Sequence, residues 1–475
     1  MPRFKKQITL LLLFFFVVSL LPSPFGQGSA SAFSVGEEKE VGEKLLSMVR
    51  TNFQVIDDPD ISQYINEIGQ RILTVAGPQY FDYHFFVIND NEFNAFAAPS
   101  GLIFIHSGLI EAMDSEGELI SVMAHECGHV TSRHISDRLA KSTKTTIGTA
   151  ALLIAGIALG GGGNALSQAV ITGSMAANAA MNLKFSREDE EEADRLSFKW
   201  MQALGVDPAE MESMLEKMYR VSVYRSANIP PYLLTHPEPK QRMGYVQDLM
   251  MDTSRPKKIY TPADNFSFLR MKQRVLSLTR DPATIRAQLL RKSSQGKDQQ
   301  SVMAQYGLAL ISLAGADYAK AESYLNNVIQ AYPDRPILKT DKAILFRQSA
   351  RPKEALALLT AAHAADRDCA YTTYILAQTL EQGGEHQKAL QLFEDLLPVL
   401  PDYAKLYLTV GNLETRLGKK GLGHYYLGHY FWMTGDSKNA KYHLNETLKD
   451  TAVEQSIVAK TKILLADIER LERDM

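Results

Sequence analysis

A fixed period of 34 residues in the carboxyl-terminal part of the chain constrains the fold more than any other feature. Three segments that end in alanine share this period: GADYAKA (315–321), ARPKEA (350–355) and GEHQKA (384–389). A helix-turn-helix unit of this length cannot bury its apolar face alone, so neighbouring units must stack into a solenoid. The next clear match, GDSKNA (435–440), begins 51 residues later and predicts an irregular end. We expect an α-helical solenoid over residues 301–475.

The rest of the chain is mostly helical but carries a short β region. Apolar residues recur at helical spacing over residues 34–75, and again after the β region. Between them, YHFFVIND (83–90) and NAFAAPSGLIFIHSG (94–108) have the composition of strands separated by turn residues. The pattern predicts an α+β domain over residues 33–255, followed by a polar helical connector over residues 256–300.

The first 32 residues have the pattern of a cleavable secretory signal peptide. Basic residues precede an apolar run from Ile8 to Leu21, and Ala30-Ser31-Ala32 supplies a small-x-small cleavage site. That run is shorter than the ~20 apolar residues that span a membrane. The formal net charge of -3 gives no indication of nucleic-acid binding. An exported protein can form disulfides, but Cys127 lies inside a catalytic motif, so we expect no bridge to Cys369.

The segment HECGH (125–129) is the strongest chemical signal in the chain. Residues four apart lie about 40° apart around a helix, so the imidazoles of His125 and His129 can reach one metal ion. Glu126 projects beside them, where a carboxylate can take a proton from an activated water molecule. We predict a zinc-peptidase site with one Zn²⁺ per chain.

Two neighbours of this motif are expected to play no part in the chemistry. His134 lies nine residues after His125, about 180° around a continuous helix, which would direct it away from the ion. Cys127 lies about 200° from His125 and is expected to face the core.

A third protein ligand must come from elsewhere, because catalytic zinc usually has three protein ligands and one water. The acidic segment SREDEEEADRLSFKW (186–200) is the best source. Its expected buried stripe contains Ala193, Leu196 and Trp200, and leaves three acidic candidates that periodicity does not separate: Asp189, Glu190 and Glu192.

These motifs together resemble the HtpX-like and CAAX-prenyl-protease-like family of zinc metallopeptidases. The resemblance rests on HECGH, on NAFAAPSG and GELISVMA before it, and on SREDEEEAD after it. It implies a zincin-type α+β domain in a mostly α protein. The family motif E-x-x-x-D implies that Glu190 is the third ligand and that Asp194 orients a zinc-binding histidine. The chain departs from the family in having Ser100 where Pro-Gly-Gly is usual, and in having Cys127.

Three further features are assigned through this resemblance. The segment LLTHPEPKQRM (233–243) implies a role for His236, either in stabilising the oxyanion or as a fourth zinc ligand that silences the resting enzyme. Arg242 is expected to bind a carboxylate or to fix this loop. The stretch Asn94, Ala95, Phe96 is expected to lie on an edge strand that binds substrate by β-augmentation.

The resemblance also implies a function. With a signal peptide and tetratricopeptide-type repeats, the chain is expected to be a zinc endopeptidase of the bacterial periplasm. Its substrates or clients would be misassembled outer-membrane β-barrel proteins, and the repeats would contact the barrel-assembly machinery. The alternative is a chaperone or adaptor with a mostly latent zinc site. The uncharged segment 145–183 is interpreted as a buried helical hairpin, or as a flap over the site or in peripheral contact with lipid.

Overall fold

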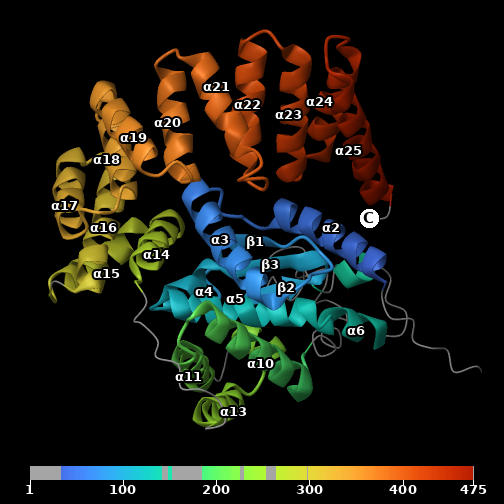
Figure 1. Cartoon of the computed structure of the whole chain (residues 1–475), viewed down its shortest axis with the longest axis vertical. Helices are drawn as coiled ribbons and strands as arrows, with labels where there is room; N and C mark the ends of the chain where they lie inside the picture. The colour runs from blue at the N-terminus through green and yellow to red at the C-terminus, as the bar shows by residue number, and fades with distance from the viewer. Residues whose placement is uncertain are drawn as a thin grey trace, which may run out of the picture.

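The computed structural model describes residues 34–141, 148–151, 154, 184–224, 229–252, 264–296 and 298–473. An amino-terminal domain with a small sheet lies against a curved row of helices that forms the carboxyl-terminal half of the chain (Figure 1). The predicted signal peptide and almost all of the uncharged segment 145–183 lie outside the described residues. Among those that are described, no helix is both long and apolar enough to cross a membrane.

The sheet of the amino-terminal domain has three strands in the order β1-β3-β2. β1 (His84–Ile88) pairs in parallel with β3 (Leu102–His106), and β2 (Ala95–Ala98) pairs antiparallel with β3. The predicted β region is therefore confirmed, and β2 is an edge strand within the described sheet. The turn between β2 and β3 places Ser100 at φ 72°, a left-handed conformation that glycine adopts at less cost.

Helices of the amino-terminal domain surround the sheet. They are α2 (Val35–Asn52), α3 (Pro59–Ala76), α4 (Ser107–Ala112), α5 (Glu116–Thr131), α6 (His134–Lys141), α10 (Arg187–Leu204), α11 (Ala209–Tyr224), α12 (Pro231–Thr235) and α13 (Pro239–Met251). Of these helices, α3, α4 and α5 pack directly on the strands of the sheet. The isoleucines that predicted α3 are all buried, at 2% exposure or less: Ile61, Ile65, Ile68 and Ile72. α5 runs beneath the sheet and packs on α10 (Figure 1). This contact brings together the HECGH segment and the acidic segment 186–200.

The segment predicted as a polar connector is helical, but its first helix is buried. α14 (Phe266–Thr279) packs on α3, α4 and the first repeat, and α15 (Pro282–Ser293) follows it. Arg270 donates a hydrogen bond to Asp60 at 2.6 Å and binds Asp341 through two nitrogens at 3.0 and 2.9 Å. Arg270 is thus paired with carboxylates from both halves of the chain.

Five helix pairs form the solenoid. They are α16 (Gln299–Ala314) with α17 (Tyr318–Ala331), α18 (Ile337–Gln348) with α19 (Pro352–Ala365), α20 (Ala370–Gln382) with α21 (His386–Leu396), α22 (Ala404–Arg416) with α23 (Lys420–Met433), and α24 (Ser437–Lys449) with α25 (Gln455–Arg473). The predicted solenoid is confirmed.

The expected irregular end of the solenoid is wrong. α17, α19, α21 and α23 begin 34 residues apart, so the period continues beyond Ala389. Gly423 occupies the position that alanine has in the earlier repeats. A methyl group there would lie 2.1 Å from Oγ1 of Thr415, and this close approach requires glycine. Because Gly423 stands where the earlier repeats have alanine, the pattern of recurring alanines does not reveal this repeat.

Charged contacts fasten the solenoid to the amino-terminal domain. His84 Nδ1 lies 2.6 Å from Asp402 Oδ2, and Arg470 lies 2.7 Å from Glu43. Figure 1 shows the row of helices extending over α3 and α2, with the carboxyl terminus close to α2. Cys127 and Cys369 are both buried and free.

Candidate metal centre

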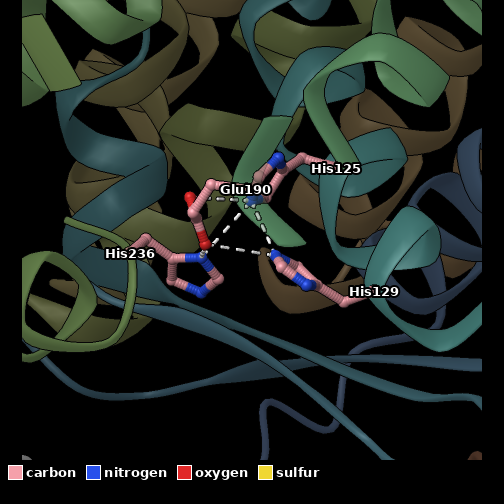
Figure 2. Close-up of side chains that lie close together, drawn as sticks. All are labelled: His125, His129, Glu190 and His236. Atoms are coloured by element: carbon pink, nitrogen blue, oxygen red, sulfur yellow. Dashed lines mark hydrogen bonds and ion pairs between the residues drawn. The ribbon is translucent and has the colours of Figure 1, made fainter. Parts of the chain in front are cut away.

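Four buried side chains converge beneath β2. His125 and His129 come from α5, Glu190 from the first turn of α10, and His236 directly follows α12 (Figure 2). Their ligand atoms all lie within 4.8 Å of one another. The two Nε2 atoms of His125 and His129 are 3.0 Å apart, and His236 Nδ1 lies 2.9 Å from Glu190 Oε1. The HExxH spacing has therefore produced the predicted histidine pair.

Local sequence explains how these elements start where they do. Ser115 caps α5, and Ser186 caps α10 in a reciprocal capping box with Asp189. Because α10 begins at Arg187, Glu190 lies in its first turn and faces α5. The backbone N–H of Phe185 donates to the carbonyl oxygen of Thr235 at 3.0 Å, which ties the His236 loop to the start of α10.

The structure separates the three acidic candidates. Glu190 is 2% exposed and lies in the cluster. Asp189 instead accepts hydrogen bonds from Arg138 and from its own capping residue. Glu192 is exposed and accepts a hydrogen bond from Ser132 at 2.9 Å. Periodicity could not distinguish these residues, whereas the family motif had selected Glu190.

Asp194 and Arg242 surround the ligands with opposite charges. Asp194 Oδ1 lies 2.8 Å from His125 Nδ1, so this carboxylate holds His125 with Nε2 toward the cluster. Arg242 pairs with both oxygens of Asp194 and lies 2.7 Å from Glu190 Oε2. Burial alone would raise the pKa of Asp194, but Arg242 and His125 outweigh it and hold that pKa below its ordinary value. Tyr245 donates a further hydrogen bond to Asp194.

The expectation that His134 points away from the site is wrong. Its Nδ1 lies 2.9 Å from His129 Nδ1, and the side chain is buried. α5 ends at Thr131, Arg133 adopts φ 56°, and α6 begins at His134, so the two histidines do not share one continuous helix. His134 fixes the far nitrogen of His129, as Asp194 does for His125.

These residues fit a divalent metal ion. Both ligand histidines engage a partner through Nδ1, so their Nε2 atoms face each other across the cluster. Tetrahedral ligands about 2.0–2.1 Å from zinc lie about 3.3 Å apart. Here the ligand atoms that contact one another are separated by 2.9 Å to 3.7 Å, and all four lie within 4.8 Å. Burial holds the pKa of His129 well below its ordinary value, which keeps the imidazole neutral and able to bind a cation.

Glu126 completes the chemistry of the motif. Its carboxylate is fully buried, and neither oxygen has a hydrogen-bond partner among the described residues. The imidazole Nε2 of His236 lies 3.6 Å from Glu126 Oε1. A buried carboxylate without a partner is costly, and such groups are found where a substrate or water will complete them.

Aromatic rings enclose the fourth residue of the cluster. The imidazole of His236 stacks on Tyr232 with ring centroids 4.3 Å apart and lies 5.0 Å from Phe185 on a tilted plane. Phe185 also stacks on His129 at 3.8 Å. Sequence reasoning missed both aromatic residues, because only the tertiary fold brings them to the metal ligands.

The predicted substrate-binding stretch lies beside this cluster. Phe96 and Ala97 on β2 line a cavity of about 30 Å³ together with Phe185 and His236. Ala95 is fully buried in the strand. Asn94 is 1% exposed, and its side-chain nitrogen has no hydrogen-bond partner among the described residues. The stretch thus lies beside the cluster, and all three of its residues are buried.

Comparisons with known proteins agree with this geometry. Residues 59–249 match the model of peptidase family M48, and residues 346–411 match a tetratricopeptide-repeat model. The Beta-barrel assembly-enhancing protease of Escherichia coli strain K12 is 32% identical over 309 residues, which are 65% of this chain and 62% of that protein. The Putative beta-barrel assembly-enhancing protease of Vibrio cholerae is 30% identical over 311 residues, 65% of this chain and 63% of that one.

A third relative matches a smaller part of this chain. The Metalloprotease LoiP of Escherichia coli is 29% identical over 192 residues, 39% of this chain and 71% of that protein. The chain spans a little over three fifths of the length of the two beta-barrel assembly-enhancing proteases. The resemblance inferred from the sequence motifs, to this class of metallopeptidase with carboxyl-terminal repeats, is confirmed.

Proposed function

Because residues 59–249 match the model of peptidase family M48, we propose that the protein is a zinc-dependent endopeptidase with a capped resting site. The carrying observation is the convergence of His125, His129, Glu190 and His236 within 4.8 Å. His125, His129 and Glu190 would hold the metal, and His236 would fill the fourth position at rest. When bound, zinc supplies a Lewis acid that lowers the pKa of a coordinated water to about 7.

Glu126 acts as the general base in this proposal. Its carboxylate has both oxygens available, so it can take a proton from the attacking water and later return it to the leaving amine. Asp194 and His134 keep the ligand histidines in the tautomer that presents Nε2. Arg242 compensates the two buried carboxylates of α10, so that Glu190 stays charged.

His236 makes the resting enzyme silent. Its imidazole lies in the cluster, 1% exposed, and the nearest cavity holds only about 30 Å³. No extended peptide can reach Glu126 until this ring withdraws. A capped site of this kind does not cleave folded proteins that it meets by chance. It favours substrates that displace the His236 ring.

The substrates proposed are misassembled outer-membrane β-barrel proteins in the periplasm, with one zinc ion per chain. Support comes from the names of the relatives and from the signal-peptide pattern of residues 1–32. An extended β-rich chain could add to the edge strand β2 at Asn94, Ala95 and Phe96. The solenoid offers a separate surface for contacts with the barrel-assembly machinery.

Glu126→Gln tests the peptidase function, and Glu191→Gln on the exposed face of α10 is the matched control. We expect purified wild-type and Glu191→Gln proteins to cleave an unfolded β-barrel protein, and Glu126→Gln to bind zinc without cleaving. Cleavage by Glu126→Gln at the wild-type rate would contradict the proposal.

The second candidate function is assistance to assembly without proteolysis, and the capped state of the cluster favours it. It predicts that Glu126→Gln fully restores barrel assembly in a deletion strain. Under the peptidase proposal, the same variant leaves defective barrel proteins undegraded.

A further inference from the structure

The hydroxyl group of Tyr232 is buried and has no hydrogen-bond partner among the described residues. The rest of the side chain is fully buried as well. Phenylalanine would pack equally well at this position and would avoid the cost of an unpaired hydroxyl. Buried polar groups of this kind cluster where a ligand supplies the missing partner.

Tyr232 faces the reaction centre. Its ring stacks on His236 at 4.3 Å, and both residues belong to the short segment of α12 and its last turn, where the His236 N–H donates to the Tyr232 carbonyl at 2.8 Å. Glu126 is its main charged neighbour. A tyrosine hydroxyl keeps its proton at neutral pH and is therefore a hydrogen-bond donor here.

The same region contains an acceptor without a donor. Both oxygens of Glu126 lack partners, as does the Tyr232 hydroxyl, and the two groups do not bond to each other. The planar imidazole of His236 lies between the rings of Tyr232 and Phe185. A rotation of the His236 side chain would vacate a flat space bordered by the Glu126 carboxylate, a base, and the Tyr232 hydroxyl, a donor. A peptide group is flat, and its hydrolysis needs a base for the attacking water and a hydrogen-bond donor for the carbonyl oxygen.

We propose that Tyr232 is a catalytic residue whose hydroxyl donates a hydrogen bond to the scissile carbonyl oxygen as it becomes an oxyanion. Glu126 takes one proton from the attacking water, the new C–O bond forms, and the carbonyl π electrons move onto oxygen. Tyr232 keeps its proton throughout and stabilises that charge. The inference rests on the proposed peptidase function and assigns the oxyanion donor that His236 cannot be while it caps the metal.

The test compares Tyr232→Phe with Tyr306→Phe. Tyr306 on α16 is a matched control because it is also fully buried with an unpaired hydroxyl, yet it lies in the first repeat. Each substitution is made in the full-length zinc-loaded protein and again with His236→Ala, and kcat and KM are measured on an unfolded β-barrel protein. We expect Tyr232→Phe to lower kcat about 100-fold or more with little change in KM, and Tyr306→Phe to change neither.

Two further readouts separate a catalytic role from a structural one. A phosphinic peptide, which mimics the oxyanion, should bind Tyr232→Phe more weakly by a factor similar to the loss in kcat. The melting temperature and zinc content of Tyr232→Phe should equal those of the wild type, because no bond is removed. A lower melting temperature with unchanged kcat would overturn the inference and show a structural hydroxyl.

Failure of the inference is distinguishable from failure of the proposed function. If wild type cleaves, Glu126→Gln does not, and Tyr232→Phe retains kcat within about threefold in both backgrounds, Tyr232 is not the donor. If neither wild type nor His236→Ala cleaves any substrate, the peptidase function falls and the role of Tyr232 falls with it.

Discussion

Arg242 donates two hydrogen bonds to Asp194, of 2.8 and 2.7 Å, from Nε and Nη2. Its third guanidinium nitrogen, Nη1, lies 2.7 Å from Glu190. All three side chains are at most 5% exposed, so one guanidinium compensates two carboxylates that water cannot reach. Removal of one partner from such a buried set leaves the others uncompensated.

Arg242→Ala should therefore destabilise the amino-terminal domain by about 3–5 kcal/mol and reduce zinc retention. Arg195→Ala is the control, because Arg195 forms only an exposed pair with Glu191, and it should change stability by less than about 1 kcal/mol. Thermal melts and zinc analysis of the two purified variants test this, and equal melting temperatures would contradict the role given to Arg242.

His134→Ala should weaken zinc binding without removing a ligand. The imidazole of His134 fixes His129 through the 2.9 Å contact between their Nδ1 atoms, and loss of such a partner typically costs about 10–100-fold in metal affinity. Competition with a chelator measures the change, and His363→Gln on α19 serves as the control. An unchanged zinc affinity would mean that His134 only fills space.

Phe185→Leu should raise basal proteolysis. The ring contacts both His236 and His129, and aromatic pairs contribute about 0.5–1.5 kcal/mol, which corresponds to roughly 2–10-fold in the fraction of uncapped protein. His236→Ala should raise turnover further, because it removes the cap altogether. Phe346→Leu in the solenoid controls for general loosening. Turnover that falls in both site variants while zinc is retained would show that His236 assists the reaction instead.

The contact between His84 and Asp402 should make domain docking depend on pH. The hydrogen bond to Asp402 raises the pKa of His84 against the opposing effect of burial. A raised histidine pKa stabilises the docked state fully below about pH 6.5, the ordinary value, and this stabilisation is lost as pH rises through the raised pKa. Amide protection factors, which correct exchange rates for their intrinsic pH dependence, should thus be lower around residues 400–404 at pH 8.5 than at pH 6.

His84→Gln should abolish that pH dependence, whereas His386→Gln within the solenoid should preserve it. Burial would raise the pKa of Asp402, but His84 and Arg50 hold it below its ordinary value. The stabilisation that the Asp402 carboxylate contributes is therefore lost only when the pH falls through that lowered pKa. The same protection factors at pH 6 and pH 8.5 in the wild type would contradict the account.

Sequence periodicity predicted the elements well where the pattern is local. The spacing of His125 and His129 fixed their shared helix face, and the 34-residue period predicted the solenoid. The failures all come from tertiary or backbone detail. The helix break at Arg133, with φ 56°, rotated His134 back to the site. Gly423 replaced the marker alanine because no methyl group fits beside Thr415.

The burial of the first connector helix likewise depends on distant partners. Arg270 is buried against Asp60 and Asp341, which lie about 210 and 70 residues away in the chain. Pairing over such distances leaves no periodic signal. The same holds for Phe185 and Tyr232, whose contacts with the ligand histidines depend on how α10 and α12 meet α5.

X-ray absorption at the zinc K-edge of the resting full-length protein tests the central claim most directly. The account predicts four nitrogen or oxygen ligands at about 2.0–2.1 Å, with three imidazoles contributing to the scattering. In His236→Ala, one imidazole should be replaced by a water oxygen, while Tyr306→Phe should leave the spectrum unchanged. Two imidazoles in the wild type, with no change in His236→Ala, would contradict the capped four-ligand site.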